Sequence, residues 1–348
     1  MKTRNFQTRQ PRQRRHAETS IKLVADKLNM PLAAVSRVFL GKRVEPERRR
    51  QVLEAARELD FVPRLAAPTI LLAIGRTNPE VHAGYTTVLS QLVLQELARK
   101  TTYPISVVPE ADENRSALEA ALAQPSVRCV IAIVFSDALE HAVKAVRFPP
   151  PVVTLNHPVP KAINVQTDHH AHGFRATQYL IEHGHKRIAF LAHELATWGS
   201  SQRYDGYRDA LQRHGIRPTA ALRFLSAEAD TSTDDPVKAL LERLDEAKPT
   251  AVLSFAEDVA LPLIRYFDVP QRISVVGLDD LPIWKHLRPA VTTIWQPLER
   301  MAQVAVEHAW RLARLPRAEA AGHAQDIILE SELMRRESVV NLMPSGRR

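Results

Sequence analysis

The sequence predicts an α/β protein in which a small all-helical head precedes two doubly wound lobes. Residues 20–63 hold three short amphipathic helices with tight breaks, and from residue 69 onward short apolar runs alternate with helical patterns. This alternation is typical of parallel sheets built from βαβ units, and two successive series of such units indicate two lobes. Ligands of such folds bind at the carboxyl ends of the strands, here in a cleft between the lobes.

The composition of the chain is typical of a globular protein without a membrane-spanning segment. The 348 residues are enough for a small head and two mid-sized lobes, and an apolar content of 45% with 25% charged residues is ordinary for a globular chain. No run of 18 apolar residues predicts a membrane helix, and residues 1–18 lack the apolar segment of a secretory signal. The single cysteine, Cys129, is expected to be a buried strand thiol. These features favour the cytoplasm.

The excess positive charge is concentrated near the N-terminus. Residues 1–68 contain 16 Lys and Arg against 7 Asp and Glu, a net charge of +9, whereas the rest of the chain carries 31 against 32, a net charge of −1. A basic head on a near-neutral body indicates a polyanionic partner more strongly than a merely solvated basic surface. Residues 1–18 have almost no apolar residues and are predicted to be a disordered basic tail.

The head has the order of elements of a helix-turn-helix. Its helices are predicted at residues 21–28, 32–39 and 46–59. Ser20 is a plausible N-cap of the first helix, Gly41 follows the second, and Pro46 suits the first turn of the third. In a helix-turn-helix the second helix enters the DNA major groove. A generic helical bundle is the alternative interpretation.

The body predicts two series of strands and helices. In the first lobe the strands are expected at 70–74, 105–108, 129–135 and 151–155, and the helices at 86–99, 115–123 and 137–146. In the second lobe the strands are expected at 187–192, 222–225, 250–255 and 273–277, and the helices at 170–183, 200–213, 236–246 and 257–266.

Two segments of the head resemble the DNA-binding head of the LacI-type (lactose/galactose repressor) family. They are V-A-D-K-L-N-M-P-L-A-A-V-S-R-V-F-L-G-K at 24–42 and R-Q-V-L-E-A-A-R-E-L-D-F-V-P at 50–63. In the body, T-D-H-H-A-H-G-F-R-A at 167–176, R-Y-D-G-Y-R-D-A-L at 203–211 and I-S-V-V-G-L-D-D at 273–280 resemble the same family in order and spacing. The resemblance implies a core of periplasmic-binding-protein type fused to the head.

Pattern and resemblance together predict the division of the chain. The expected parts are a basic tail at 1–18, a helix-turn-helix domain at 19–63, a short hinge at 64–68, a ligand-binding core at 69–336 and a tail at 337–348. Within the core, lobe one is expected at 69–166 and 296–325, and lobe two at 167–295 and 326–336. The family has a longer hinge that folds on DNA and wedges apolar side chains into the minor groove, and Leu65 is the only evident wedge here.

The predicted DNA-binding residues lie on and around the second helix. They are Ser20, Leu32, Ala33, Ser36, Arg37, Lys42 and Arg43. Arg37 can contact a guanine edge with two hydrogen bonds, although a phosphate contact or a surface salt bridge is the alternative. By resemblance, Leu32 and Ala33 occupy the family's specificity positions, where they can touch only a thymine methyl. Lys42 and Arg43 are expected to contact phosphates.

The predicted ligand-binding residues are Asn78, Arg203, Glu257 and Asp279. By resemblance, Arg203 and Asp279 match effector contacts of the family, because a guanidinium can donate to a carboxylate or hydroxyl pair and a carboxylate can accept from hydroxyls. A salt bridge that closes the cleft is the alternative. One of Trp198, Trp284 and Trp295 could stack on a ligand or simply pack in the core. The histidines at 169–193 lack a metal-binding spacing, so neither a metal nor a cofactor is expected.

The sequence therefore predicts a DNA-binding regulator of LacI type, with repression as the expected direction. A homodimer would bind a pseudo-palindromic operator, and a small polar metabolite such as a sugar or sugar acid would modulate its affinity. One alternative is a soluble small-molecule-binding protein whose head is vestigial or does not bind DNA. An enzyme on the doubly wound core is another alternative, but no phosphate-binding loop or nucleophile motif supports it.

Overall fold

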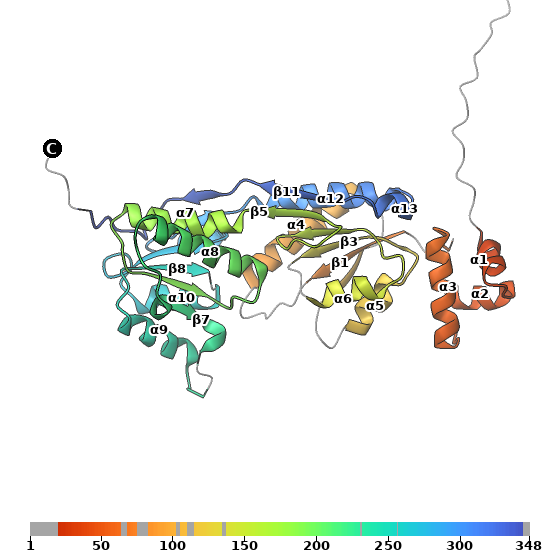
Figure 1. Ribbon diagram of the computed structural model, residues 1–348, viewed down its shortest axis with the longest axis horizontal. Coiled ribbons are helices and arrows are strands. Elements are labelled where there is room, and N and C mark those ends of the chain that lie inside the picture. The colour runs from red at the N-terminus through yellow and green to blue at the C-terminus, as the bar shows by residue number, and fades with distance from the viewer. Residues whose placement is uncertain are drawn as a thin grey trace, which may run out of the picture.

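The computed structural model describes residues 20–63, 68–74, 83–101, 105–109, 115–133, 137–229, 232–255 and 257–343. Head, lobe one and lobe two lie in a row along the long axis of the molecule (Figure 1). The expected basic tail 1–18, most of the hinge, Leu65 and Asn78 lie outside the described residues. Within the described ranges, no helix has the length and apolar character needed to cross a membrane.

Three helices form the head, within one residue of their predicted bounds. They are α1 (Ile21–Lys27), α2 (Leu32–Phe39) and α3 (Pro46–Glu58). Val24, Val35 and Val52, one from each helix, are completely buried against one another, which is the apolar spacing expected of a helix-turn-helix core. Ser20 stands at the N-cap of α1, but its side chain makes no capping hydrogen bond, so it contributes less to the helix start than predicted.

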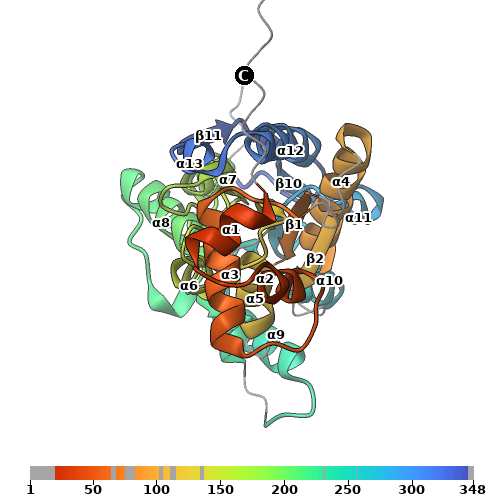
Figure 2. The same cartoon turned by 90° about the vertical axis from the view of Figure 1, so that its right-hand side faces the viewer.

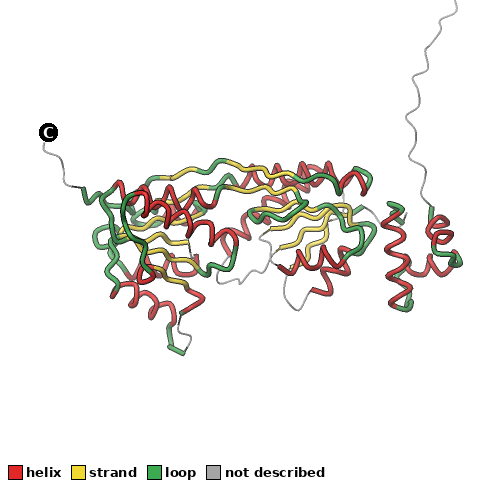
Figure 3. The backbone as a smooth tube through the Cα atoms, viewed as in Figure 1, coloured by secondary structure: helices red, strands yellow, loops and turns green. Residues whose placement is uncertain are grey.

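Lobe one is a six-stranded parallel sheet with helices on both faces (Figure 3). Its strands are, in sheet order, β11 (Gln325–Leu329), β5 (Ile163–Thr167), β4 (Val152–Leu155), β3 (Val127–Ile133), β1 (Thr69–Ile74) and β2 (Ile105–Pro109). Its helices are α4 (Ala83–Lys100), α5 (Arg115–Leu122), α6 (Asp137–Ala145), α12 (Leu298–Arg314) and α13 (Arg317–Ala320). Helices α4 and α12 share one core with the sheet, and α5 and α6 share the other. Cys129 is buried in β3, as predicted, and burial raises the pKa of its thiol to about 12.

Lobe two is also a six-stranded sheet with helices on both faces. Its strands are, in sheet order, β12 (Glu332–Met334), β10 (Thr292–Trp295), β9 (Ser274–Leu278), β8 (Ala251–Phe255), β6 (Ile188–Ala192) and β7 (Arg223–Leu225). Its helices are α7 (His169–Glu182), α8 (Trp198–Arg213), α9 (Pro236–Glu246), α10 (Glu257–Tyr266) and α11 (Pro282–His286). Helices α7 and α8 pack on one face and α9 and α10 on the other. The strands are parallel except for β12, which runs antiparallel to β10.

Four strands differ from the prediction: β5, β10 and β12 were not predicted, and β11 was assigned to the other lobe. Strand β5 was not predicted, because Asn164, Gln166 and Thr167 interrupt its apolar pattern, although all three side chains are buried. The segment 326–336 was assigned to lobe two, and for residues 326–329 this assignment is wrong, because β11 pairs in parallel with β5 of lobe one. Only the following β12 enters lobe two. The physical reason is that β11 follows α12, which packs on lobe one, so the chain returns beside the nearest open edge of that sheet.

Helices α7 and α8 approach each other backbone to backbone. A Cβ atom on Gly173 of α7 would lie 1.9 Å from the carbonyl oxygen of Arg203, and one on Gly206 of α8 would lie 2.0 Å from the carbonyl oxygen of His170. Only glycine is tolerated at such a contact. The start of α7 and the segment of α8 around Arg203 are therefore held in a fixed relation.

Candidate functional site

The outer helices of the head present the predicted reading surface. Helices α1 and α2 lie on the side of α3 that faces away from lobe one (Figure 2). On α2, Leu32, Ala33 and Arg37 are exposed and Ser36 is half-buried, whereas the buried Val35 and Val38 anchor the helix. The residues of this surface are thus brought together as predicted, while their contacts with DNA remain a prediction.

Basic side chains flank this surface. Lys42 and Arg43 are exposed in the turn between α2 and α3, and neither they nor Arg37 has an ion-pair partner within the described part of the chain. Arg50 differs, because it pairs with Glu47 at 2.8 Å. Unpaired cations at the rim of a reading helix are suited to phosphate contacts that position the head on a duplex.

The head is seated on lobe one through a polar contact that the sequence did not suggest. Asp60, just after α3, accepts two hydrogen bonds from the guanidinium of Arg128 on β3. Arg57, a buried residue of α3, donates to the carbonyl oxygen of Ala123 at 2.6 Å. Arg317 of α13 lies beside them and donates to the carbonyl oxygen of Val127 at 3.1 Å. We refer to Arg57, Asp60, Arg128 and Arg317 as the head–core junction.

The head–core junction holds three guanidinium groups and one carboxylate. The pKa of Arg317 is lowered to about 10, first by burial and then by the neighbouring cations Arg128 and Arg57, while Asp60 acts in the opposite direction. Arg128 also donates to the carbonyl oxygen of Leu315 at 2.8 Å. Asp60 is therefore the counter-charge on which this cluster depends.

A pocket opens between the two lobes and encloses about 890 Å³, including space open to solvent. Lobe one contributes Tyr85, Asn156 and His157 to its lining. Lobe two contributes His169, His193, Glu194, Thr197, Gly199, Ser200, Arg203, Ser254, Phe255, Leu278, Asp279 and Trp284. The structure thus places Arg203 and Asp279 in one pocket, as predicted, while the side chain of Glu257 and all of Asn78 lie outside what it describes.

Hydrogen bonds connect the lobes at the floor of this pocket. Gln296, where the chain returns to lobe one, accepts from Asn156 at 2.9 Å and from the hydroxyl of Thr167 at 2.6 Å. Its amide nitrogen donates to the carboxylate of Asp279 in lobe two. Asn156 in turn donates to the hydroxyl of Tyr85 on α4. This path, which we call the Gln296 network, runs from lobe one to a ligand-facing carboxylate in lobe two.

Arg203 and Asp279, the two pocket residues predicted from the sequence, interact electrostatically with each other. Burial of Asp279 raises the pKa of its carboxyl to about 6, while the nearby Arg203 and the hydrogen bond from Gln296 act in the opposite direction. The guanidinium carbon of Arg203 lies 5.7 Å from the centre of the Phe255 ring, so a cation–π contact orients it in the pocket. A ligand would therefore meet one strong acceptor and one planar donor.

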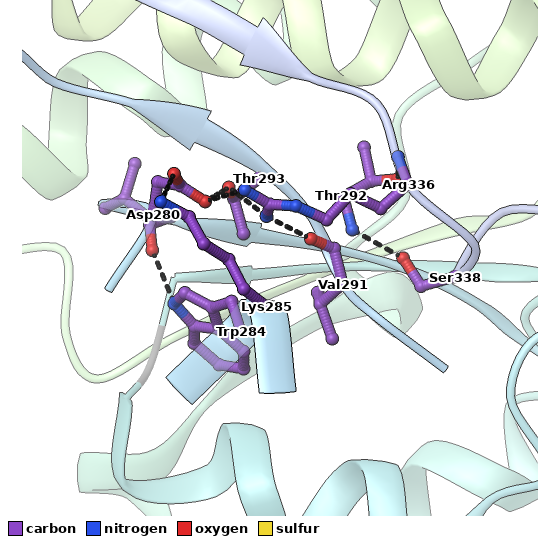
Figure 4. A network of polar contacts seen from close by, with 9 residues as sticks. Asp280, Trp284, Lys285, Val291, Thr292, Thr293, Arg336 and Ser338 are labelled. Atoms are coloured by element: carbon purple, nitrogen blue, oxygen red, sulfur yellow. Dashed lines mark hydrogen bonds and ion pairs between the residues drawn. The ribbon is translucent and has the colours of Figure 1, made fainter. Parts of the chain in front are cut away.

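Asp280, the next residue, is not among the residues that line the pocket, and its carboxylate lies in a polar network within lobe two (Figure 4). It accepts from the hydroxyl of Thr293 at 2.8 Å and from Arg336, and Lys285 lies 3.3 Å away. Asp280 is therefore structural, and only Asp279 of the pair lines the pocket. Trp284 beside it lines the pocket while donating its indole N–H to the carbonyl oxygen of Leu278 at 3.0 Å.

Several lining residues were not predicted to bind a ligand. His169 and His193 were considered only as metal ligands, and no cluster of three metal-binding side chains occurs in the described parts of the chain. Ser254 is the penultimate residue of β8, and its position after an apolar run at the carboxyl edge of a parallel strand is a signal that could have identified it. Of the three tryptophans considered for stacking, only Trp284 is among the lining residues.

Comparison with known proteins supports the same interpretation. Residues 177–339 match the family described as periplasmic binding protein-like domain. The chain is 28% identical over 309 residues to the HTH-type transcriptional regulator AscG of Escherichia coli K12, which covers 82% of this chain and 89% of that protein. It is also 28% identical over 348 residues to the HTH-type transcriptional regulator CelR of Thermobifida fusca, with coverage of 93% and 99%.

Solved structures agree over nearly the whole chain. A CelR–cellobiose complex has a TM-score of 0.66 and 25% identity, covering 92% of this chain and 99% of that one. The lac repressor dimer bound to operator and the anti-inducer ONPF has a TM-score of 0.64 and 22% identity, covering 93% and 100%, and supports the likeness of fold.

A helix-turn-helix head joined to a two-lobed core with a pocket at the lobe junction defines a DNA-binding transcriptional regulator. Within that class, the chain is similar to regulators of the LacI-type family. The resemblance found in the sequence is thereby confirmed. The named relatives are transcriptional regulators, in agreement with the prediction that this chain is not an enzyme.

Replacing Arg37 by Ala should reduce sequence discrimination at one base pair by about 1–3 kcal/mol, since a bidentate base contact has about that value. Selection of sites from a random DNA library followed by affinity measurement at constant salt would detect the loss. Arg48→Ala, at an exposed position in the first turn of α3, is the matched control and should weaken binding to all sequences alike. A variant lacking Arg37 that selects the same sites with unchanged selectivity would contradict the assignment.

Replacing Asp279 by Asn should change how stability depends on pH. The pKa of Asp279 is raised from 3.8 to about 6 in the folded protein, so the folded state binds its proton more tightly and loses stability as pH rises from about 4 to about 6. The Asn variant has no such group to titrate. Between pH 4 and pH 6 its free energy of unfolding should therefore rise relative to that of the wild type, by about 1–3 kcal/mol. Urea unfolding at pH 4 to 8 measures it, with the exposed Asp205→Asn on α8 as control. Parallel pH profiles for all three proteins would refute the prediction.

Proposed function

We propose that the protein represses transcription as a homodimer on a pseudo-palindromic operator and that a small polar ligand in the inter-lobe pocket changes its operator affinity. The observation that carries this proposal is the pocket itself, in which residues of both lobes converge on a buried acceptor and a planar donor. A ligand that contacts both lobes favours one lobe arrangement over another and thereby shifts the population of the operator-competent state. Such a regulator acts where DNA is present, in the cytoplasm.

The Gln296 network offers a route by which the lobes respond to the ligand. A hydroxyl donated to Asp279 would compete with the amide of Gln296, which also holds Asn156 and Thr167 of lobe one. Occupation of the pocket would therefore alter the contacts that set the angle between the lobes. Hinge closure around a ligand is a common form of such a transition.

The dimer is proposed on grounds of symmetry. One head presents a single short reading helix, whereas two heads related by a twofold axis would read two half-sites about one helical turn apart. Doubling the contact in this way raises affinity and selectivity together. The ligand class is proposed to be a sugar or a sugar derivative, because Asp279, Arg203 and the indole of Trp284 together suit hydroxyl-rich rings.

Genomic footprinting, followed by operator binding at several salt concentrations, tests this function. Discrete sites with two half-sites should appear, and the logarithm of the binding constant should fall linearly with the logarithm of salt concentration, as expected when cations replace counterions on phosphates. Sedimentation at the concentrations used for binding should give twice the mass of one chain. If no discrete site appears with or without a panel of sugars, the head does not act as a DNA reader and the regulator function is wrong.

Replacing Asp60 by Asn should weaken the link between ligand and operator. The exchange removes the counter-charge of Arg128 in the head–core junction while leaving the pocket and α2 unchanged. We expect the ligand's affinity to be unaffected, whereas the factor by which ligand changes operator affinity should shrink by about fivefold to tenfold, which corresponds to about 1–1.4 kcal/mol of coupling.

A matched control is available at the end of the same helix. Glu58→Gln also removes one carboxylate, but Glu58 pairs with Lys27 inside the head, at 2.7 Å. Its coupling factor should equal that of the wild type. Equal coupling in the Asp60 and Glu58 variants would show that the junction does not transmit the signal.

A further inference from the structure

Two buried histidines at the start of α7 have no hydrogen-bond partner. His169 and His172 are 2% and 0% exposed, and none of their four ring nitrogens is bonded within the described structure. A buried polar group without a partner has lost its hydration with no hydrogen bond in return, which is unfavourable. Because His169 also lines the inter-lobe pocket, a ligand can supply its missing partner, whereas His172 lies behind it.

His169 and the guanidinium of Arg203 flank the same glycine. A Cβ atom on Gly199 would lie 3.3 Å from Nδ1 of His169 and 3.6 Å from Nη2 of Arg203. Trp198 packs edge-on against the imidazole, with ring centres 5.2 Å apart, and fixes its orientation. The absence of a side chain at Gly199 therefore leaves room for one ligand group between two fixed nitrogen donors.

The charges that face His169 are all of one sign. Its electrostatic neighbours are Arg203 on α8, His172 on its own helix and His157 from the segment between β4 and β5, and His172 in turn faces Arg175. No carboxylate is among these neighbours. Burial and these cations lower the pKa of both histidines, so both are neutral at pH 7 and His169 offers one N–H donor.

Asp279 supplies a hydrogen-bond acceptor in the same pocket, in contrast to the donor at His169. Arg203 is an electrostatic neighbour of both His169 and Asp279, and all three residues line the pocket. The hydroxyl of Ser254 also lines the pocket, buried and without a partner in the described structure. The pocket thus has an acceptor at Asp279 and an uncompensated donor region at His169.

We propose that His169 and Arg203 form a subsite for a carboxylate, and that the ligand is a polyhydroxylated carboxylic acid, a sugar acid, rather than a neutral sugar. The inference rests on the proposed function and specifies the ligand of the same pocket. The carboxylate accepts from the guanidinium and from the imidazole N–H, while hydroxyls of the same molecule donate to Asp279 and pair with Ser254. An anion beside the buried His169 favours its imidazolium form, so binding takes up a proton and tightens as pH falls from 8 to 6.5.

Calorimetric titration of the full-length protein with matched pairs of ligands tests this subsite. The pairs are glucose with glucuronate, galactose with galacturonate, and glucose with its open-chain acid gluconate, each at pH 8 and pH 6.5. We expect at least one acid to bind at least 100-fold more tightly than its neutral partner, and about tenfold more tightly at the lower pH. The other titratable groups of the pocket, His157, His193, Glu194 and Asp279, are unchanged in the variants below, so their contribution cancels in the comparison.

Variants assign the effect to His169. His169→Asn should weaken binding of that acid by at least tenfold and remove most of its pH dependence. His170→Asn is the matched control, because His170 is the next residue of α7 but pairs with Asp209 at 2.9 Å away from the pocket lining, and its affinity should equal that of the wild type. Gly199→Ala, which fills the space between the two donors, is a second test and should also weaken the acid by at least tenfold. Thermal melting confirms that each variant is folded.

The outcomes separate this inference from the proposed function. A neutral sugar that binds at least as tightly as its acid and changes operator affinity would leave the regulator intact and overturn the carboxylate subsite. Failure of all the acids to bind, or equal affinities of wild type and His169→Asn, would overturn it as well. Binding of an acid through His169 without any change in operator affinity would support the subsite and count against the proposed function.

Discussion

The hydrogen bonds of Gln296 are the constraint on which the arrangement of the core depends. One amide side chain accepts from Asn156 and Thr167 in lobe one and donates to Asp279 in lobe two. A buried amide that loses one of these partners would incur the cost of an unsatisfied polar group, so the lobes cannot separate freely at this point. The same network ends on the carboxylate that faces the pocket. Lobe geometry and ligand binding are thereby linked through a single residue.

Helices α7 and α8 of lobe two hold one side of the pocket in a fixed arrangement. Gly173 and Gly206 let α7 and α8 touch through their backbones, so His169 and Arg203, one on each helix, cannot move apart independently. Rigid placement of donors lowers the entropy that a ligand must lose on binding. The pocket therefore combines a preorganised donor side on the helix pair with an acceptor side whose hydrogen bonds can rearrange.

The head is connected to this core by charge rather than by apolar burial. Asp60 stands among Arg57, Arg128 and Arg317, and its loss would leave partly buried cations without a counter-charge. Such contacts are directional, so they fix the orientation of α3 on lobe one more than they add to stability. Only four residues lie between Pro63 and Pro68 in the sequence that connects the head to the core.

The sequence by itself determined the helix-turn-helix, the two series of strands and helices, and the pocket positions of Arg203 and Asp279. Periodic apolar spacing and local family motifs carry that information, because both act over short stretches of chain. Tertiary structure decided the rest. The remaining features join residues distant in sequence or depend on which face a side chain presents. They are the lobe in which β11 lies, the junction at Asp60, and the proximity of His169 to Arg203 and Gly199. Such long-range pairing leaves no local pattern, since it is set by how packed elements come together.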